Sequence, residues 1–538
     1  MKLRDSFLMM AGFCRVLAAG EPAHGVLIKP SRMDLIREGK AIGYVTVPAG
    51  TTVSVVSSST AGYLVRRSEG DQPFEVTTDS INLPPQSSTT APEPSASVQT
   101  TASIASAANS PAPVTPPLPT AKPPLTAKPL AKSAGPDAAA VDKALGIPLF
   151  GKGNLWEEND AAVASRLKWP LESKTTYEAG FRRYPYTFNS ETKILGVRAL
   201  SLFLQGVRDH PSRITILFAN MGDISAYATP EEAKRQRSSE YLIVTDPMLK
   251  ACRDAMTRDA SALETALRDL FGEARPVTLG RFSTLSENAR RWDWNGTSFL
   301  LTSPKNQYVA LRILPTASLE DRQSAEKSFS QSRSALAERV ERRPNGDVII
   351  SDLPMVDQGR KGYCVPATFE RLLRYYGLSE DMNVLAMAGQ TGPGGGTRIA
   401  DIQTATYAML SDAGARVSHP NFNGSVLEIK PYIDAGKPVL FPLYSTPRFN
   451  ERVNERMQRR ISVSDWKEWK EKFLPSLGRS ETLVQNPDRS HVCLIIGYNE
   501  ATREIAISDS WGTAATERWM TEEEARQIRQ GQSVTVIE

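Results

Sequence analysis

The sequence predicts a multidomain protein: a small N-terminal β-barrel, a disordered proline-rich linker, a mixed α/β middle domain and an α+β C-terminal domain. Three observations lead to this prediction. The chain has 538 residues, more than one hydrophobic core ordinarily supports. A stretch rich in Pro, Ser, Thr and Ala interrupts it and contains almost no large apolar residue. Short alternating strands precede this stretch, whereas mixed helical and strand patterns follow it.

The composition excludes several classes of function. With 40% hydrophobic and 23% charged residues, the chain is typical of globular proteins. A formal net charge of +4 gives no reason to expect nucleic acid as a partner. The four histidines are scattered singly, so no zinc site of ordinary spacing can be assembled. We expect no metal and no other cofactor. Four cysteines make no disulfide framework, and they do not decide the redox compartment.

Residues 1–24 resemble a signal peptide, because Lys2 and Arg4 precede an apolar run from Phe7. Arg15 ends that run early, so an ordinary N-terminal helix is the alternative. We expect an exported protein, periplasmic or extracellular, with a cytoplasmic location as the alternative. No other stretch of the sequence approaches the length needed to span a membrane.

Residues 25–83 contain short strand patterns separated by turns, such as the one at Pro48–Gly50. This spacing predicts a small β-barrel and resembles bacterial Src-homology-3-like modules. The resemblance implies binding to a cell-wall or envelope component, and a simple spacer is the alternative. Residues 84–140 are the predicted linker, which its prolines should keep semi-extended. A proline-rich partner site is the alternative there.

Residues 141–345 predict a mixed α/β domain of unassigned role. Ile214–Phe218 is a strand-like apolar run, and Trp292–Gly296 marks a turn between strands. Apolar residues at helical spacing between Leu249 and Leu270 predict a core helix that includes Cys252. We find no group of residues in this domain that suggests chemistry.

Residues 346–538 carry the strongest candidate for chemistry, a loop and amphipathic helix between Leu353 and Gly377. Pro366 suits only the first turn of that helix. Cys364 therefore stands at the helix N-terminus, where free amides and the helix dipole favour an anion and lower the pKa of a thiol. From the helix alone, a buried structural cysteine is the alternative.

Two later residues favour a reactive cysteine. His491 opens an apolar strand, and a second strand, Glu504–Ser508, leads into Asp509. A hairpin centred near Glu500 would place Asp509 opposite His491, where its carboxylate can orient the imidazole. The next residues include Trp511, whose indole could shield that hydrogen bond from water.

Gln358, Cys364, His491 and Asp509-Ser-Trp-Gly together resemble a papain-like cysteine peptidase. The closest resemblance is to the bacteriocin-processing (double-glycine leader) peptidases, which also have aspartate where most papain-like enzymes have asparagine. It covers about 190 residues and implies four roles: Cys364 as nucleophile, His491 as base and then acid, Asp509 as the orienting group and Gln358 in the oxyanion hole. Dedicated leader peptidases are fused to membrane transporters, and this sequence shows no membrane span.

The resemblance implies hydrolysis of a peptide or protein substrate through a thioester on Cys364. A peptidoglycan endopeptidase or an acyl transferase on the same fold is one alternative. A scaffold whose peptidase-like domain only binds peptides is another, from a different class of function.

Other features of this domain have simpler interpretations. We expect Gly392–Thr397 to be a turn before a helix capped by Thr397. His419 should lie at the surface, and Cys493 should pack beside the site on the same strand face as His491. The long insertion at residues 444–490 contains an arginine-rich helix, interpreted either as a surface loop or as a lid that selects acidic substrates.

Overall fold

The computed structural model describes residues 24–27, 29, 31–37, 40–47, 51–59, 62–66, 74–77, 80–82, 135–151, 153–188, 191–237, 242–319, 336–477 and 482–538. Contacts divide the chain into two compact units, and residues 136–538 all belong to the second. The candidate signal peptide, up to residue 23, and most of the linker lie outside the described residues. Helix α1 (Ala138–Leu145) begins inside the range predicted as linker.

The first unit contains a five-stranded antiparallel sheet in the order β6-β5-β4-β1-β7. Its strands are β1 (His24–Leu27), β4 (Thr52–Ser59), β5 (Gly62–Arg66), β6 (Phe74–Val76) and β7 (Ile81–Asn82). In β4, Val53 and Val55 are buried and Thr52 is exposed, the alternation of a sheet with one covered face. Strands β2 (Ser31–Arg37) and β3 (Lys40–Val47) pair with each other, and the contacts group residues 32–48 with the second unit. The Src-homology-3-like barrel stays a prediction.

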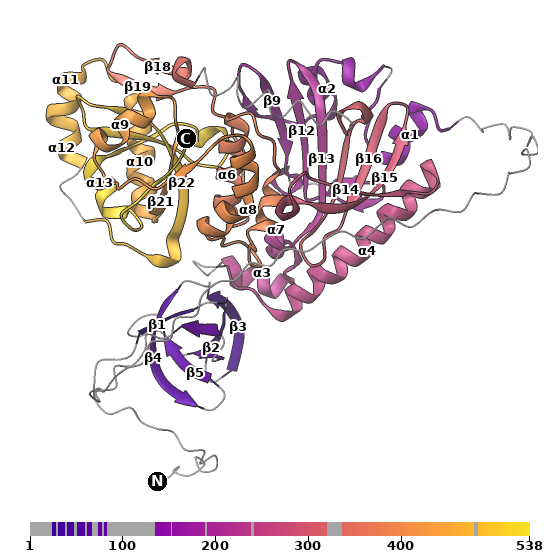
Figure 1. The fold of residues 1–538 in the computed structure, drawn as a ribbon, viewed down its shortest axis with the longest axis horizontal. Helices are drawn as coiled ribbons and strands as arrows, with labels where there is room; N and C mark the ends of the chain where they lie inside the picture. The colour runs from indigo at the N-terminus through magenta and orange to yellow at the C-terminus, as the bar shows by residue number, and fades with distance from the viewer. Residues whose placement is uncertain are drawn as a thin grey trace, which may run out of the picture. The chain divides into compact units, whose positions relative to one another are not determined.

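The middle part of the second unit is built on an eight-stranded antiparallel sheet in the order β14-β15-β16-β17-β13-β12-β9-β8 (Figure 1). Its strands are β8 (Leu171–Lys174), β9 (Glu178–Arg183), β12 (Ser201–Val207), β13 (His210–Asn220), β14 (Arg275–Leu279), β15 (Glu287–Trp294), β16 (Thr297–Thr302) and β17 (Tyr308–Pro315). The smaller elements are β10 (Lys193–Ile194), β11 (Val197–Arg198), α2 (Asp160–Leu167), α3 (Pro230–Arg237) and the 3-10 helix η4 (Met221–Tyr227).

A single long helix, α4 (Asp246–Phe271), packs along strands β13, β15, β16 and β17 of this sheet. Its apolar stripe, with Cys252 fully buried, lies in the middle core as the sequence predicts. The predicted turn after Trp292 is also present: Asn295 and Gly296 both have positive φ, the conformation that two-residue hairpins require.

The C-terminal part, residues 336–538, combines helices with a curled sheet. The sheet runs β18-β19-β22-β21-β25-β20, and β23 joins it by pairing with both β22 and β24. Its strands are β18 (Val340–Arg342), β19 (Asp347–Ile350), β20 (Val417–Ser418), β21 (Val439–Tyr444), β22 (Ser490–Asn499), β23 (Glu504–Ser508), β24 (Arg518–Thr521) and β25 (Thr535–Ile537). The helices are α6 (Cys364–Tyr375), α7 (Met382–Ala388), α8 (Ile399–Asp412), α9 (Val426–Asp434), α10 (Pro447–Arg460), α11 (Trp466–Glu468), α12 (Leu474–Leu477) and α13 (Glu522–Ile528).

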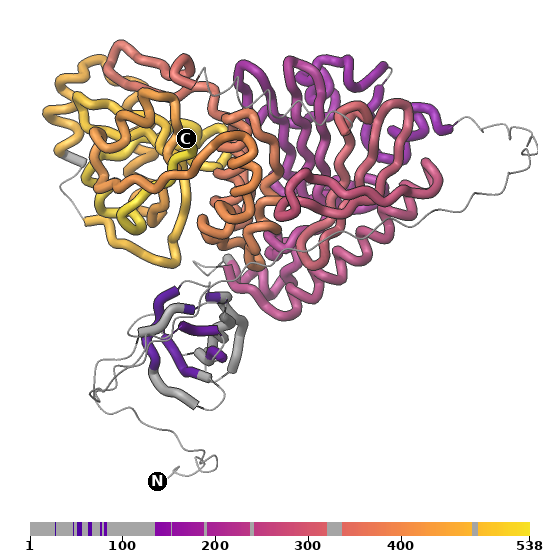
Figure 2. Tube along the Cα trace, in the orientation of Figure 1, coloured from indigo at the N-terminus to yellow at the C-terminus, as the bar shows by residue number. Residues whose placement is uncertain are grey.

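Helix α6 lies between the C-terminal strands and the middle sheet (Figure 2). Its apolar residues, including Phe369 and Leu373, pack in the C-terminal core. The opposite face is buried too: Glu370 is 2% exposed and Arg371 1%. A helix with both faces covered cannot shift without moving both parts of the unit. Among the described residues, no helix is long and apolar enough to cross a membrane.

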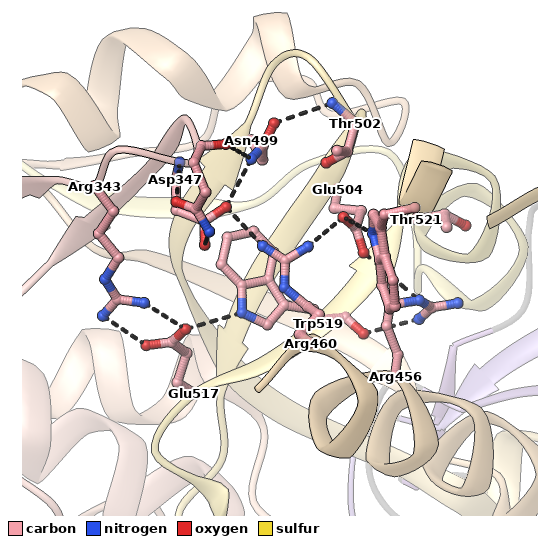
Figure 3. Close-up of polar contacts among 12 residues, drawn as sticks. Arg343, Asp347, Arg456, Arg460, Asn499, Thr502, Glu504, Glu517, Trp519 and Thr521 are labelled. Carbon is pink, nitrogen blue, oxygen red and sulfur yellow. Dashed lines mark hydrogen bonds and ion pairs between the residues drawn. The ribbon is translucent and has the colours of Figure 1, made fainter. Parts of the chain in front are cut away.

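The arginine-rich helix α10 turns much of its charge inward, contrary to the lid interpretation. Arg456 is fully buried and donates to the Trp519 carbonyl at 2.8 Å and to Glu524 at 2.9 Å. Arg460 is 8% exposed, pairs with Asp347 at 2.6 Å and with Glu504, and lies 3.8 Å from the centre of the Trp519 ring (Figure 3). These arginines fasten the insertion to the sheet, so they are not free to select a substrate.

This cluster predicts a large difference between two neighbouring arginines. Arg460→Ala leaves Asp347 buried without its ion pair and leaves Glu504 with Arg456 alone, so the free energy of unfolding should fall by about 3–5 kcal/mol. Arg459, which pairs with Glu455 and is more than half exposed, provides the matched control. Arg459→Ala should change stability by less than about 0.5 kcal/mol. Urea denaturation of both variants measures the difference, and equal losses would contradict the inward role of Arg460.

Candidate active site

Cys364 is the first residue of α6, directly after the capping residue Tyr363, as the sequence predicts. Its side chain is partly buried. Burial by itself would raise the pKa of the thiol, but the hydrogen bond and charge of His491 and nearby backbone amides lower it below its ordinary value. Cys364 is therefore the described cysteine most ready to form a thiolate.

His491 lies near the start of β22 and contacts both of its expected partners. Its Nε2 is 2.8 Å from Asp509 Oδ1, and its side chain also hydrogen-bonds to Cys364. Burial lowers the pKa of the imidazole, but these two partners raise it to about 9. Because Nε2 faces the carboxylate, Nδ1 is the ring nitrogen left for the sulfur. The pair Cys364–His491 thus favours thiolate and imidazolium at neutral pH.

Trp511 covers this pair on one side. Its ring stacks on the His491 imidazole, with 4.6 Å between the ring centres and an angle of 29° between the planes. The indole is 38% exposed, so one face meets solvent while the other excludes water from the imidazole. This is the shielding that the sequence suggested for Trp511.

Asp509 has a second partner that sequence reasoning missed. Arg518 Nη1, on β24, donates to Asp509 Oδ2 at 2.5 Å, and both side chains are nearly fully buried. Burial opposes ionisation of Asp509, but His491 and Arg518 hold its pKa below the ordinary value. Two side chains of α10 in turn hold the guanidinium: Asn450 at 2.8 Å and Asn454 at 3.1 Å.

Gln358 lies in the loop before α6 and is 8% exposed. Its Nε2 donates to the Lys361 carbonyl at 2.9 Å, and its backbone N–H donates to the Ser510 carbonyl at 2.9 Å. The second bond joins this loop to the residue after Asp509. One hydrogen of the amide group remains available, so Gln358 can donate to an oxyanion while the loop holds its position.

The hairpin that brings His491 and Asp509 together differs from its predicted register. Strand β23 pairs with β22 through Leu494–Ser508 and Asn499–Glu504, with an irregularity between Ile495 and Gly497. This register is shifted by two to three residues from a hairpin centred on Glu500. The Asp509 side chain still reaches His491, because it follows the end of β23 rather than pairing within it.

The structure tests the other predicted residues of this domain. Cys493 is fully buried beside the site, and burial raises the pKa of its thiol well above the ordinary value. His419 is exposed, as expected. Thr397 does not cap the following helix: α8 starts after Arg398, and the Thr397 hydroxyl bonds to Thr391 at 2.6 Å.

The glycine-rich loop lies against the segment that precedes Cys364. Gly362 N–H donates to the Gly394 carbonyl at 2.7 Å, and Gly396 N–H donates to the Gly362 carbonyl at 3.1 Å. A Cβ on Gly395 would lie 2.3 Å from Gly362 Cα. This close backbone approach accounts for the glycine at position 395. Within the described residues, no group of three or more His, Cys, Asp or Glu side chains is arranged to hold a metal ion.

Residues 350–532 match the family described as Peptidase_C39 like family. The matched range contains all four residues that the sequence singled out, together with Arg518. No curated protein matches the chain. The C-terminal part is therefore similar to C39-like peptidases, and its helix and curled sheet are consistent with a papain-like domain.

The electrostatics of the site predict selective alkylation. At pH 7, iodoacetamide should modify Cys364 much faster than Cys252 or Cys493, because burial raises the thiol pKa of the latter two. His491→Ala removes the hydrogen bond and charge that lower the Cys364 pKa, so alkylation should slow at neutral pH and recover at higher pH. Peptide mass mapping over time measures all three sites. Equal rates at Cys364 and Cys252 would contradict an activated thiolate.

The buried ion pair between Arg518 and Asp509 predicts that asparagine at position 509 would destabilise the protein. Asp509→Asn can still accept the His491 N–H, but it leaves a buried guanidinium without a carboxylate, at a cost of about 3–5 kcal/mol.

A double-mutant cycle tests the pair. Combining Asp509→Asn with Arg518→Met removes both charges, so the double variant should be more stable than the sum of the two single losses predicts. Urea denaturation of the four proteins gives the coupling free energy. Purely additive losses would show that the ion pair contributes no coupling.

Proposed function

We propose that this protein is a cysteine peptidase that hydrolyses peptide bonds through a thioester on Cys364. The observation that carries the proposal is the hydrogen-bonded series Cys364–His491–Asp509, which starts at the N-terminus of a helix buried on both faces. The likeness of residues 350–532 to C39-like peptidases supports a peptide or protein as the substrate.

In the first half of the reaction, the Cys364 thiolate attacks the carbonyl carbon of the scissile bond. The negative charge that develops on the carbonyl oxygen is stabilised by the Gln358 amide and the Cys364 backbone N–H. His491, as imidazolium, donates a proton to the departing amine as the C–N bond breaks. The products of this half are the free amine and the thioester.

In the second half, neutral His491 takes a proton from water, and the resulting hydroxide attacks the thioester carbonyl. The same two donors stabilise the second tetrahedral intermediate. The C–S bond then breaks, which releases the carboxylic acid and restores the thiolate and imidazolium. Asp509 keeps the imidazole oriented throughout and stabilises its charged form, while Arg518 keeps Asp509 in place.

Loss of either member of the reactive pair should abolish turnover. Cys364→Ala removes the nucleophile and His491→Ala its proton carrier, so each should lower kcat by at least about 10³-fold without unfolding the protein. Hydrolysis of a peptide library, with products identified by mass, measures the effect. Wild-type-like hydrolysis by either variant would contradict the assignment, and products joined to an added amine would identify an acyl transferase.

The pH profile of hydrolysis should be bell-shaped. Activity should rise as the Cys364 thiol ionises, at a pH below its ordinary pKa, and fall as His491 loses its proton at about pH 9. Because Cys364 and His491 titrate as a coupled pair, the apparent pKa of each limb of the profile describes the pair rather than one residue. Steady-state kinetics from pH 4 to pH 10 give the two apparent pKa values. A profile that keeps rising well above pH 9 would exclude imidazolium as the acid.

A further inference from the structure

The loop that carries Gln358 rests on the middle sheet along its whole length. The Asp357 N–H donates to Glu172 at 2.9 Å, and the Tyr184 hydroxyl donates to the Asp357 carbonyl at 2.6 Å. Three residues after Gln358, the side chain of Lys361 points into the same part of the unit and pairs with Asp223. Contacts from the middle domain therefore lie on both sides of Gln358, from Glu172 and Tyr184 before it and from Asp223 of η4 after it.

Lys361 is an unusual anchor because its side chain is completely buried. Its Nζ forms no hydrogen bond among the described residues and lies 3.4 Å from Asp223 Oδ2. The faces of Tyr184 and Tyr363 lie 5.3 and 5.6 Å from the same nitrogen, within the range of cation–π attraction. A buried ammonium needs a compensating charge, and Asp223 in η4 provides it.

The backbone of Lys361 connects this anchor to the oxyanion site. Its carbonyl accepts the hydrogen bond from Gln358 Nε2 at 2.9 Å. A displacement of Lys361 therefore changes the direction of the Gln358 amide. Tyr363, two residues after Lys361, also contacts the middle domain. Its hydroxyl donates to Asn220 at 3.0 Å, and its ring fills the space where a Cβ on Gly222 would lie.

Resting on the proposed peptidase activity, we infer that Asp223 of the middle domain is a positioning residue for the reaction: its ion pair with Lys361 fixes the loop that aims the Gln358 amide at the developing oxyanion. The middle domain thereby completes the oxyanion hole of the C-terminal domain.

The positioning role of Asp223 can be distinguished from the role of the Cys364–His491 pair. The thiolate depends on His491, Asp509 and Arg518, and within the described residues none of these three forms a hydrogen bond or ion pair with Asp223 or Lys361. Loss of the anchor should therefore slow attack on the carbonyl while leaving the reactivity of the thiol intact. A merely structural role would lower both together.

The test is Asp223→Asn in the full chain, assayed for peptide hydrolysis and for iodoacetamide alkylation of Cys364. The amide keeps the shape of the side chain but removes the charge that balances Lys361. We expect kcat to fall by about 10- to 100-fold, as when an oxyanion donor is misplaced, with little change in KM. The alkylation rate at pH 7 should equal that of the wild type.

Two further variants make the result specific. Asp259→Asn is the matched control, since Asp259 is a buried carboxylate of the same domain that pairs with Arg258 on α4. It should change neither readout. Tyr184→Phe removes the other anchor of the loop but keeps its ring, and it should lower kcat in the same direction with unchanged alkylation.

The outcomes distinguish failure of the positioning role of Asp223 from failure of the proposed peptidase activity. Unchanged kcat in Asp223→Asn would overturn the positioning role, and so would an equal loss of kcat and alkylation rate. A wild-type protein that hydrolyses no peptide would instead overturn the proposed function, and the positioning role with it. Should Asp223→Asn fail to fold, the double variant Asp223→Asn with Lys361→Met, which removes both charges of the pair, decides the question by the same two readouts.

Discussion

Burial of the polar face of α6 is the constraint on which the candidate site depends. Glu370, Arg371 and Arg374 lie within a helix that has no solvent-facing side, so each charge must find its partner inside the protein. Arg374 pairs with Glu178 of the middle sheet at 2.8 Å. Burial raises the pKa of Glu370 to about 7, although Arg374 opposes the rise. These requirements fix where α6 begins, and hence where Cys364 stands.

Arg371 shows the same constraint without a carboxylate partner. Its guanidinium donates to the Pro354 carbonyl at 2.9 Å and to the Ser508 hydroxyl at 2.5 Å. Burial lowers its pKa to about 10, so it remains charged at neutral pH. One side chain of α6 thus ties together the start of the Gln358 loop and the strand end that precedes Asp509. The charged groups behind the site align its parts before any substrate binds.

Local patterns in the sequence were enough to predict the position of Cys364 at a helix start and of His491 in an apolar strand. What they could not supply was long-range pairing. Lys361 and Asp223 are 138 positions apart, and no periodic pattern relates them. Arg518 was missed for the same reason, because only the fold brings it behind Asp509.

Two errors have identifiable physical causes. The hairpin was predicted to turn at Glu500, whereas its turn lies between the paired residues Asn499 and Glu504; the irregularity at Ile495–Gly497 then reduces the shift in register from three residues to two. The arginines of α10 were interpreted as exposed, either on a surface loop or on a lid that faces a substrate, because charged helices are usually solvated. Arg456 and Arg460 instead meet carboxylates contributed by strands and a helix distant in the sequence. A charge pattern shows where charges are, but not which of them the fold neutralises.

The two supports of the site act on different steps of the proposed reaction. From α10, the hydrogen bonds to Arg518 hold Asp509 and so favour the thiolate; from the middle domain, Asp223 of η4 holds the loop of Gln358 and so favours attack on the carbonyl. Without the middle sheet, Lys361 would be hydrated rather than buried, and no unpaired charge would oblige the loop to keep its course. Because water would satisfy the ammonium in many loop conformations, the isolated C-terminal part would lose the fixed direction of its oxyanion donor. In the proposed reaction the middle domain thus serves the loop of Gln358, besides holding the helix that carries Cys364.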